Sequence, residues 1–328
     1  MKPSRIREVL VKVLKTRWPA FIWGPPGVGK SSVVHQVAKD LSLSVLDVRA
    51  SQLDPTDLRG IPAVINGQAV WCPPAFLPSP DAPAGILFLD EINAAPPLVQ
   101  ASLYQLVLDR RIGDYILPPN WHIIAAGNRS EDRAVVFRLS SALANRFVHL
   151  NFETSFDDWR QWALDVGIHP MVVGFLALRR ELLHSPSTTE HAFPTPRSWE
   201  MVSDTLQHFK SPDDCHDVLV GTIGEGAATE FSAFARTALH ERDFLKIISS
   251  PEDAELPSGI GNQYALVSWL IARRKEPTVL SAAARLLDRL PPELSVILVR
   301  DMVRADALFV TEPGYIQFMK AHPGLLNG

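Results

Sequence analysis

Cysteine and long apolar runs are both scarce in this chain. Among 328 residues only Cys72 and Cys215 are cysteines, and they share no metal-ligand spacing. This argues against a disulfide framework and favours a reducing compartment. No apolar run approaches the ~20 residues that a membrane-spanning helix requires. The charged N-terminus lacks the apolar stretch of a signal peptide. We therefore expect a cytoplasmic protein without a membrane span.

An excess of positive charge is also absent. The chain has 32 Lys and Arg residues against 36 Asp and Glu residues, a formal net charge of −4. Proteins whose main partner is nucleic acid usually carry a basic domain or a basic run. The sequence therefore makes nucleic acid an unlikely main partner, although a local basic patch stays open.

The first part of the chain alternates short apolar runs with helical stretches, which is typical of a parallel α/β sheet. Strands are predicted at Ala20–Trp23, Ser44–Val48, Gly85–Leu89 and Trp121–Ala126. Helices are predicted at residues 6–14, Ser31–Leu41 and Leu98–Leu108. Two hairpins, one turning at Asn66-Gly67 and one at Gly113, are predicted as insertions at the sheet edge.

From Phe156 onward the apolar residues recur at helical spacing. Predicted helical stretches are Met171–Leu183, Trp199–Phe209, Val218–Leu239, Tyr264–Arg274, Val279–Leu290 and Leu294–Ala305. Stretches rich in proline and serine separate some of them. The sequence therefore divides into an α/β part at residues 1–152 and a mostly helical part at residues 153–328.

The segment Gly24–Ser31 fills every position of the phosphate-loop pattern G-x-x-x-x-G-K-[ST], the Walker A motif. Its glycines let successive N–H groups point at phosphate oxygens, and the following helix directs its positive end at the same anion. Lys30 is expected to neutralise the β- and γ-phosphates, and Ser31 to offer a hydroxyl to Mg²⁺. ATP and Mg²⁺ are therefore the predicted cofactors. The predicted nucleotide contacts are Gly24, Pro26, Gly27, Val28, Gly29, Lys30, Ser31, Ser32 and Asp90.

The apolar run Ile86–Leu89 ends in two carboxylates, Asp90 and Glu91, in the manner of a Walker B motif. At the end of a central strand, Asp90 would hold Mg²⁺ together with Ser31. Glu91 is placed to polarise the water that attacks the γ-phosphate. The alternative is a strand that simply leaves the core into solvated acids. We predict ATP hydrolysis, because nucleotide binding alone does not need the second acid.

Four segments in this order resemble the MoxR branch of the AAA+ ATPases, within the dynein-related group. They are Gly24–Ser31, Leu89–Asn93, Ala126–Asn128 and Ala142–Phe147. The resemblance covers about residues 5–205. It implies an AAA+ parallel-sheet domain followed by an α-helical lid and a C-terminal helical extension. Ala94-Ala95 and Arg129 depart from the residues common in that branch, which suggests a divergent member.

The resemblance implies roles for three further residues. Asn128 resembles the sensor-1 asparagine, which hydrogen-bonds the attacking water or the γ-phosphate. Arg146 resembles the arginine finger, which enters the neighbouring subunit's site and stabilises transferring charge. Arg197 resembles sensor 2, reaching from the lid to the γ-phosphate. Alternatives stay open: Asn128 as a turn cap, Arg146 as a surface residue with Arg138 as the finger, and Arg197 paired with Glu200.

The resemblance also implies a homo-oligomeric ring, a hexamer in this family. Its activity would be chaperone-like, remodelling or activating a protein partner, often one with a von Willebrand factor A domain. A nucleic-acid motor or nuclease-associated NTPase is one alternative, and a weakly cycling nucleotide-binding scaffold is another. Trp71, Phe76 and Tyr115 lie in or beside the hairpins. They are candidates for gripping a polypeptide in a pore, unless they pack on their own hairpin.

Overall fold

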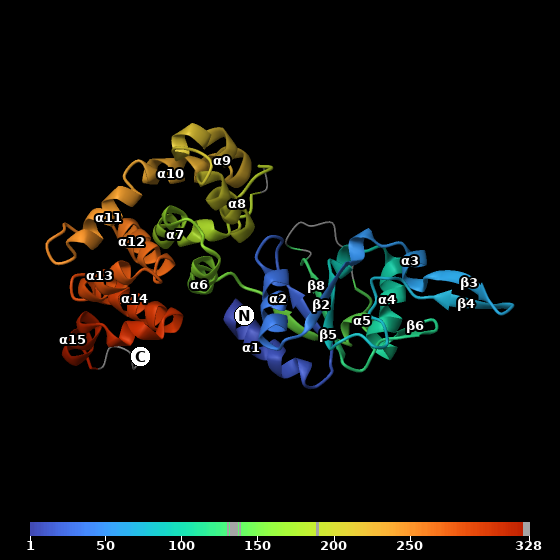
Figure 1. Cartoon of the computed structure of the whole chain (residues 1–328). Helices are drawn as coiled ribbons and strands as arrows, with labels where there is room; N and C mark the ends of the chain where they lie inside the picture. Colours follow the sequence, from blue (N-terminus) through green and yellow to red (C-terminus); the bar gives the residue numbers. More distant parts are fainter. Residues whose placement is uncertain (130, 132–136, 138, 188–189, 324–328) are drawn as a thin grey trace. The chain divides into compact units, whose positions relative to one another are not determined.

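The computed structural model describes residues 1–129, 131, 137, 139–187 and 190–323. The chain forms two compact units, Met1–Ser155 and Phe156–Gly328 (Figure 1). The first unit combines a sheet with helices. The second contains helices alone in its described residues.

The N-terminal unit is built on a five-stranded sheet with the order β2-β5-β8-β1-β9 and parallel pairing throughout. The strands are β1 (Ala20–Trp23), β2 (Ser44–Arg49), β5 (Gly85–Asp90), β8 (Trp121–Gly127) and β9 (Val148–Asn151). The first four confirm the predicted strands to within one residue. The edge strand β9 was missed, because it is short and its exposed His149 and Asn151 interrupt the apolar pattern.

Helices cover both faces of this sheet. The helices α1 (Pro3–Leu14) and α2 (Lys30–Asp40) pack on one face, and α4 (Pro97–Asp109) packs on the other. Successive strand residues point to opposite faces, so Ile22 joins the α1 and α2 core whereas Phe21 joins the α4 core. Burial on both faces explains why the inner strands β1, β5 and β8 are almost continuous apolar runs. All three predicted helices are confirmed.

Two hairpins form separate two-stranded sheets and do not extend the central one. Their strands are β3 (Ile61–Ile65), β4 (Gln68–Cys72), β6 (Arg111–Ile112) and β7 (Tyr115–Ile116). In the first hairpin, Asn66 and Gly67 have φ values of 52° and 77°. A two-residue turn that matches the strand twist needs positive φ at both positions. Both predicted hairpins are confirmed, and the ribbon of β3 and β4 projects from the unit next to α3 (Pro55–Arg59) (Figure 1).

The C-terminal unit is a set of packed helices. They are α6 (Phe156–Val166), α7 (Pro170–Leu178), α8 (Pro196–Leu206), α9 (His216–Ile223), α10 (Glu225–Ala235), α11 (Glu241–Ser249), α12 (Ile260–Ala272), α13 (Pro277–Leu286), α14 (Pro292–Ala305) and α15 (Pro313–Ala321). Short 3₁₀ turns lie at η4 (Arg180–Leu183), η5 (Pro212–Cys215) and η6 (Ala307–Thr311). No helix in the described ranges combines the length and apolar composition needed to cross a bilayer.

One predicted helix of this unit was wrong, and two helices, α11 and α15, were missed. The stretch Val218–Leu239 is divided between α9 and α10 at Gly224, whose φ is 81°. A residue with this backbone conformation ends a helix, and glycine adopts it at little cost. A side chain there would also meet the carbonyl oxygen of Ala192 at 2.8 Å.

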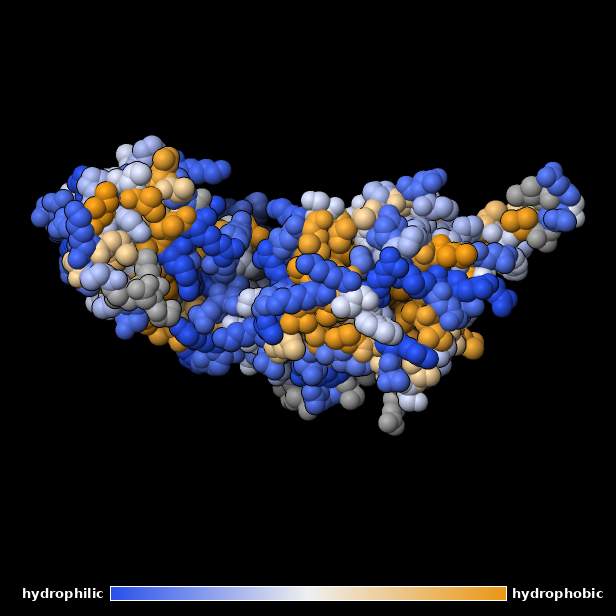
Figure 2. All heavy atoms as spheres, turned by 90° about the horizontal axis from the view of Figure 1, so that it is seen from below, coloured by the Kyte–Doolittle hydropathy of each residue, from blue (hydrophilic) through white to orange (hydrophobic). Residues whose placement is uncertain are grey.

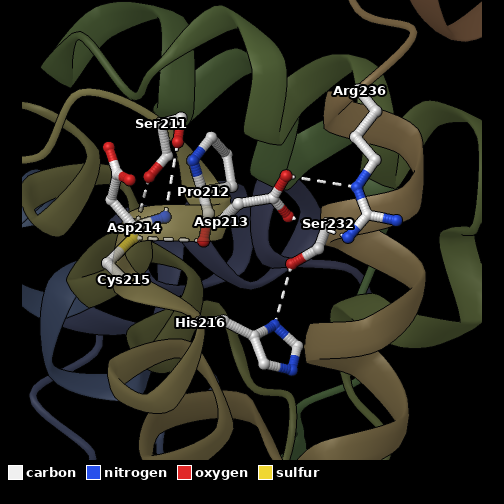
Figure 3. A network of polar contacts seen from close by, with 8 residues as sticks. All are labelled: Ser211, Pro212, Asp213, Asp214, Cys215, His216, Ser232 and Arg236. Atoms are coloured by element: carbon white, nitrogen blue, oxygen red, sulfur yellow. Dashed lines mark hydrogen bonds and ion pairs between the residues drawn. The ribbon is translucent and has the colours of Figure 1, made fainter.

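Polar contacts tie the helices of the C-terminal unit together. Arg160 of α6 and Asp301 of α14 form an ion pair of 2.7 Å, with each side chain only 1% exposed. A second network joins η5, α9 and α10 at the surface (Figure 3). There Arg236 pairs with Asp213 at 3.0 Å, and His216 Nδ1 lies 3.0 Å from the Ser232 hydroxyl. No part of either network belongs to the predicted site.

Candidate functional site

The predicted phosphate loop lies between β1 and α2. Gly27 and Gly29 have φ values of 75° and 100°, conformations that side-chain-bearing residues rarely adopt. Gly29 is the N-cap of the eleven-residue helix α2. The free N–H groups of the first helical turn therefore adjoin the loop, which is the arrangement that binds anions. Of the other predicted contacts, Val28 is buried in the core, and Pro26 and Ser32 are exposed.

Lys30 is fixed at the centre of the site. Its side chain is almost buried, and its ammonium donates to the carbonyl oxygens of Gly24 at 2.6 Å and Pro25 at 2.8 Å. It also donates to Oδ1 of Asn128 at 2.9 Å. The strands β1 and β8 are parallel neighbours, so their C-terminal ends meet and bring the two residues together. The structure thus places the predicted sensor asparagine beside the phosphate-loop lysine.

Ser31 and Asp90 are likewise brought together. The Ser31 hydroxyl donates to Oδ2 of Asp90 at 3.0 Å. Hydroxyl and carboxylate oxygens are the hard donors that Mg²⁺ prefers, so this pair fits a magnesium ion bound with nucleotide phosphates. The Asp47 carboxyl lies near the same place, and its pKa is raised, mainly by burial and secondly by the negative charge of Asp90, while His35 opposes the shift. A bound cation would relieve this repulsion.

Glu91 follows in an unusual backbone conformation. Its φ is 54°, in the left-handed region, and its N–H donates to Oδ1 of Asp90 at 2.9 Å. Backbone strain of this kind is frequent at functional sites. The side chain is exposed, and its Oε2 accepts a hydrogen bond of 2.6 Å from the Ser51 hydroxyl. The Glu91 carboxylate therefore has a defined partner.

Ser51 was not predicted from the sequence. It lies in the 3₁₀ turn η1 (Ala50–Gln52), directly after β2. The strands β2 and β5 are paired with Arg49 opposite Asp90, so the turn after one strand adjoins Glu91 after the other. No local motif marks Ser51, and only the strand order reveals its role as partner of the carboxylate.

Asn93 is a second residue of the site that was not predicted from the sequence. Its side chain is only 3% exposed, in the 3₁₀ turn η2 (Ile92–Ala94). Its Nδ2 donates to the carbonyl of Asn128 at 2.6 Å, and its Oδ1 accepts from the N–H of Asn128 at 3.2 Å. The position of the Asn128 backbone is therefore fixed by one buried amide. Gly127 is required here, because a side chain would approach Asn93 Oδ1 to 2.3 Å.

Arg146 lies apart from these contacts. It follows the short helix α5 (Ser141–Ala144), which is capped by the Ser140 hydroxyl. Its side chain is exposed and makes no ion pair with any residue that the structure describes. It lines a shallow, open depression together with Ser141, Ala142, Ala144, Asn145, Phe147 and His149. Arg138, the alternative finger, lies outside the described residues.

Arg197 belongs to the C-terminal unit. It is exposed in the first turn of α8, where Thr195 and Ser198 form a capping box. Within the described part of the chain it forms no ion pair with Glu200, so the alternative of a local salt bridge is not seen. Its role as a sensor stays a prediction.

Comparison with known proteins bears on the N-terminal unit. Residues 19–147 match the model of the AAA domain of the dynein-related subfamily. This match covers less than half of the chain. It spans the phosphate loop, the two acids, Asn128 and Arg146, so each of these residues lies inside the segment that is similar to AAA domains. AAA domains belong to ATPases, and the side chains that such chemistry needs are present here.

Individual relatives of the AAA domain match over limited stretches. The subunit RuvB of the Holliday junction branch migration complex from Christiangramia forsetii is 31% identical over 90 residues, 27% of this chain and 22% of RuvB. RuvB from Staphylococcus haemolyticus is 27% identical over 164 residues, 44% of this chain and 43% of RuvB. The chain thus matches less than half the length of either relative. Among solved structures, NtrX from Brucella abortus in complex with ADP has a TM-score of 0.43 and 17% identity, covering 98% of this chain and 68% of NtrX.

The hairpin aromatics are largely packed. The hydroxyl of Tyr115 donates to the Pro78 carbonyl at 2.8 Å, and burial raises the pKa of Tyr115 to about 12. Phe76 packs against the α4 core. Trp71 stays 39% exposed, with the Arg59 guanidinium 6.0 Å from the centre of its ring. Of the three predicted gripping residues, only Trp71 is therefore available at the surface.

Proposed function

We propose that this chain hydrolyses ATP and uses the hydrolysis cycle to remodel a macromolecular partner as part of an oligomeric ring. The observation that carries this proposal is the meeting of Lys30 with Asn128 and of Ser31 with Asp90 at the C-terminal ends of three consecutive parallel strands, β5, β8 and β1. Nucleotide binding needs the loop alone. The added acid and asparagine are what hydrolysis needs.

Each residue of the loop has a task in this proposal. Lys30 exchanges some of its contacts with protein carbonyls for the β- and γ-phosphate oxygens. Ser31 and Asp90 hold Mg²⁺, which neutralises charge on the phosphate oxygens when bound. The N–H groups of the loop and of the first turn of α2 hold the remaining oxygens. The proposed nucleotide contacts are Gly24, Pro26, Gly27, Val28, Gly29, Lys30, Ser31, Ser32 and Asp90.

Glu91 and Asn128 act on the attacking water. The Glu91 carboxylate is exposed, so water can reach it, and it accepts the proton as the water attacks. The Asn128 amide orients that water or the γ-phosphate, with its backbone held by Asn93. A weakly cycling scaffold is the less favoured reading, because it has no use for Glu91.

Arg146 is proposed to complete the nucleotide site of the neighbouring subunit. Its exposure and its place beside an open depression support a role as an arginine finger supplied to the next subunit. A homo-oligomeric ring, hexameric as in MoxR-type AAA+ ATPases, provides such an interface. Arg197 would serve as sensor 2 from the helical C-terminal unit. Arginine suits both tasks because its guanidinium is always charged.

A protein is the partner that the surface favours. The ribbon of β3 and β4 exposes apolar side chains, with Ile61 75% and Val64 79% accessible (Figure 2). Exposed apolar groups gathered on one element mark protein interaction surfaces more often than nucleic-acid sites. We propose a chaperone-like, cytoplasmic function, and a von Willebrand factor A domain protein is the partner class of the MoxR-type resemblance.

A nucleic-acid motor is the second candidate. Two relatives are subunits of the Holliday junction branch migration complex, which favours this reading. Turnover stimulated by DNA, with the stimulation falling as salt rises, would support it. Stimulation by a protein partner with no response to DNA would support the first candidate.

The Glu91→Gln variant tests hydrolysis itself. It should bind ATP as the unmodified chain does and lose turnover by about 10²-fold or more, because glutamine cannot accept the proton. Phosphate release and nucleotide affinity are the measurements. Unchanged turnover in Glu91→Gln would show that Glu91 is not the base.

A further inference from the structure

His149 connects two parts of the N-terminal unit that the nucleotide contacts leave separate. It lies on the edge strand β9, and its Nδ1 accepts a hydrogen bond of 2.8 Å from Nε1 of Trp23. Its Nε2 lies 2.8 Å from the carbonyl oxygen of Ala144. Trp23 directly precedes the phosphate loop, and Ala144 is the last residue of α5, just before the turn that carries Arg146.

These two contacts define the protonation of the imidazole. The indole N–H of Trp23 can only donate, so His149 Nδ1 must be unprotonated. The carbonyl of Ala144 can only accept, so Nε2 must carry the proton. A single neutral tautomer therefore satisfies both partners, and each contact orients the ring for the other.

Ring packing restrains the same side chains. Phe21 and Trp23 stack with centroids 4.1 Å apart, and Trp23 and His149 are nearly parallel at 6.0 Å and 21°. Phe147 meets Phe21 edge-on at 5.3 Å. The strands β1 and β9 place Phe21 opposite His149 in register. A rotation of the imidazole would therefore break its hydrogen bond to the indole.

The carbonyl that His149 contacts belongs to the turn that carries Arg146. The same Ala144 oxygen accepts from the N–H of Phe147 at 3.3 Å, which closes the turn around Asn145 and Arg146. The N–H of Arg146 donates to the Leu143 carbonyl at 3.1 Å. His149 Nε2 and the N–H of Phe147 therefore share one carbonyl oxygen, and that oxygen closes the turn that carries Arg146.

We propose that His149 is a positioning residue that transmits the state of the phosphate loop to the Arg146 turn of the same subunit. A displacement of Trp23 when the loop is filled moves the imidazole, and the imidazole moves the turn. The next subunit in the ring then receives a correctly placed guanidinium. This inference rests on the proposed function of Arg146 as a finger acting between subunits.

The His149→Phe variant tests the proposal, because it keeps a stacking ring and removes both hydrogen bonds. We expect its ATP affinity to stay within about twofold of the unmodified chain and its turnover to fall about tenfold, as a small displacement of a catalytic group does. Unchanged turnover would overturn the proposal. His208→Phe, a change at an exposed histidine of the C-terminal unit, is the matched control and should leave turnover unchanged.

Mixed assemblies show on which subunit the defect falls. His149→Phe subunits are mixed with an excess of Glu91→Gln subunits, which fill their own loop with ATP and keep an intact Arg146 turn but do not hydrolyse. Each His149→Phe site then receives a sound finger, so turnover per His149→Phe subunit should rise about tenfold. No recovery would show that His149 acts on its own loop, which overturns the proposal.

A parallel mixture separates failure of this proposal from failure of the proposed function. Arg146→Ala subunits are mixed with the same Glu91→Gln subunits. Recovery in this mixture without recovery for His149→Phe overturns the positioning role alone. Recovery in neither mixture overturns the finger acting between subunits, and the positioning role with it.

Two further variants keep the test valid if His149→Phe does not fold. His149→Gln retains an N–H that can reach the Ala144 carbonyl and should keep most of the turnover. Equal losses in His149→Gln and His149→Phe would contradict positioning through Ala144. Trp23→Phe removes the donor to Nδ1 and keeps a single aromatic ring, and its smaller loss should recover in the Glu91→Gln mixture. Loss without recovery would count against the proposal.

Discussion

The buried amide of Asn93 holds the main chain of Asn128 from both sides. One hydrogen bond of 2.6 Å runs to the Asn128 carbonyl, and one of 3.2 Å comes from the Asn128 N–H. The Asn128 side chain is in turn bonded to the Lys30 ammonium at 2.9 Å. The turn η2, which follows Asp90 and Glu91, is thereby connected to the phosphate loop through Asn128, which comes directly after the strand β8.

Asn93→Ala should separate nucleotide binding from hydrolysis. The change leaves the Asn128 backbone groups without their partner, so the Asn128 amide loses its fixed position. We expect ATP affinity within about twofold and turnover reduced about 10²-fold, as misplacement of a positioning group does. Kinetics and nucleotide titration are the measurements. Asn120→Ala, at an exposed asparagine that bonds the Ala82 carbonyl, is the control and should keep full activity. Full turnover in Asn93→Ala would disprove the role.

Ser51→Ala should raise the basal turnover. The Ser51 hydroxyl donates to the Glu91 carboxylate at 2.6 Å and so occupies an oxygen that could otherwise accept from the attacking water. Removing the donor frees this oxygen for the water, and we expect turnover to increase roughly two- to fivefold with unchanged ATP affinity. Ser51→Thr keeps a hydroxyl and should behave as the unmodified chain. A lower turnover in Ser51→Ala would instead mean that Ser51 holds Glu91 in its working position.

Arg146→Ala should abolish turnover while leaving ATP binding intact. No described residue pairs with this guanidinium inside the subunit, so its removal should not disturb the fold. Loss of an arginine finger lowers turnover by about 10³-fold or more. Phosphate release and nucleotide affinity are measured together. Arg5→Ala removes an exposed arginine of α1 that pairs with Glu8 and should have little effect. Weakened ATP binding in Arg146→Ala would point to a role within its own site.

Breaking the ion pair between Arg160 and Asp301 should destabilise the C-terminal unit. Both side chains are 1% exposed, and once Arg160 is removed the buried Asp301 carboxylate keeps only its contact of 3.3 Å with the exposed Arg300. Arg160→Met should lower the free energy of unfolding by about 3–5 kcal/mol, and adding Asp301→Leu should restore much of it. Urea unfolding followed by tryptophan fluorescence is the measurement.

The surface pair of Arg236 and Asp213 is the matched control for that experiment (Figure 3). Both side chains are exposed, and solvent screens such pairs strongly. Arg236→Met should therefore leave the unfolding midpoint nearly unchanged. Equal effects of Arg160→Met and Arg236→Met would contradict the importance of burial.

Local sequence determined the parts of this protein whose requirements are met within a few residues. The phosphate loop is contiguous because one turn of backbone must surround the phosphates, which explains why Gly24–Ser31 was readable. The strand before Asp90 was readable because burial on both faces demands an unbroken apolar run. Asn66-Gly67 predicted its hairpin because both residues accept positive φ. In the helical part, the apolar pattern continued across Gly224 and predicted one helix where the structure has two. The pattern does not show the backbone conformation of a glycine.

Only the tertiary structure decided which distant residues meet. Ser51 with Glu91, Asn93 with Asn128, and Trp23 with His149 each join segments whose distance depends on strand order and register. The pairing of Arg160 with Asp301 depends on how two helices far apart in the chain pack. No local pattern records such pairings, because a hydrogen bond constrains the two groups it joins and leaves the residues around each of them free.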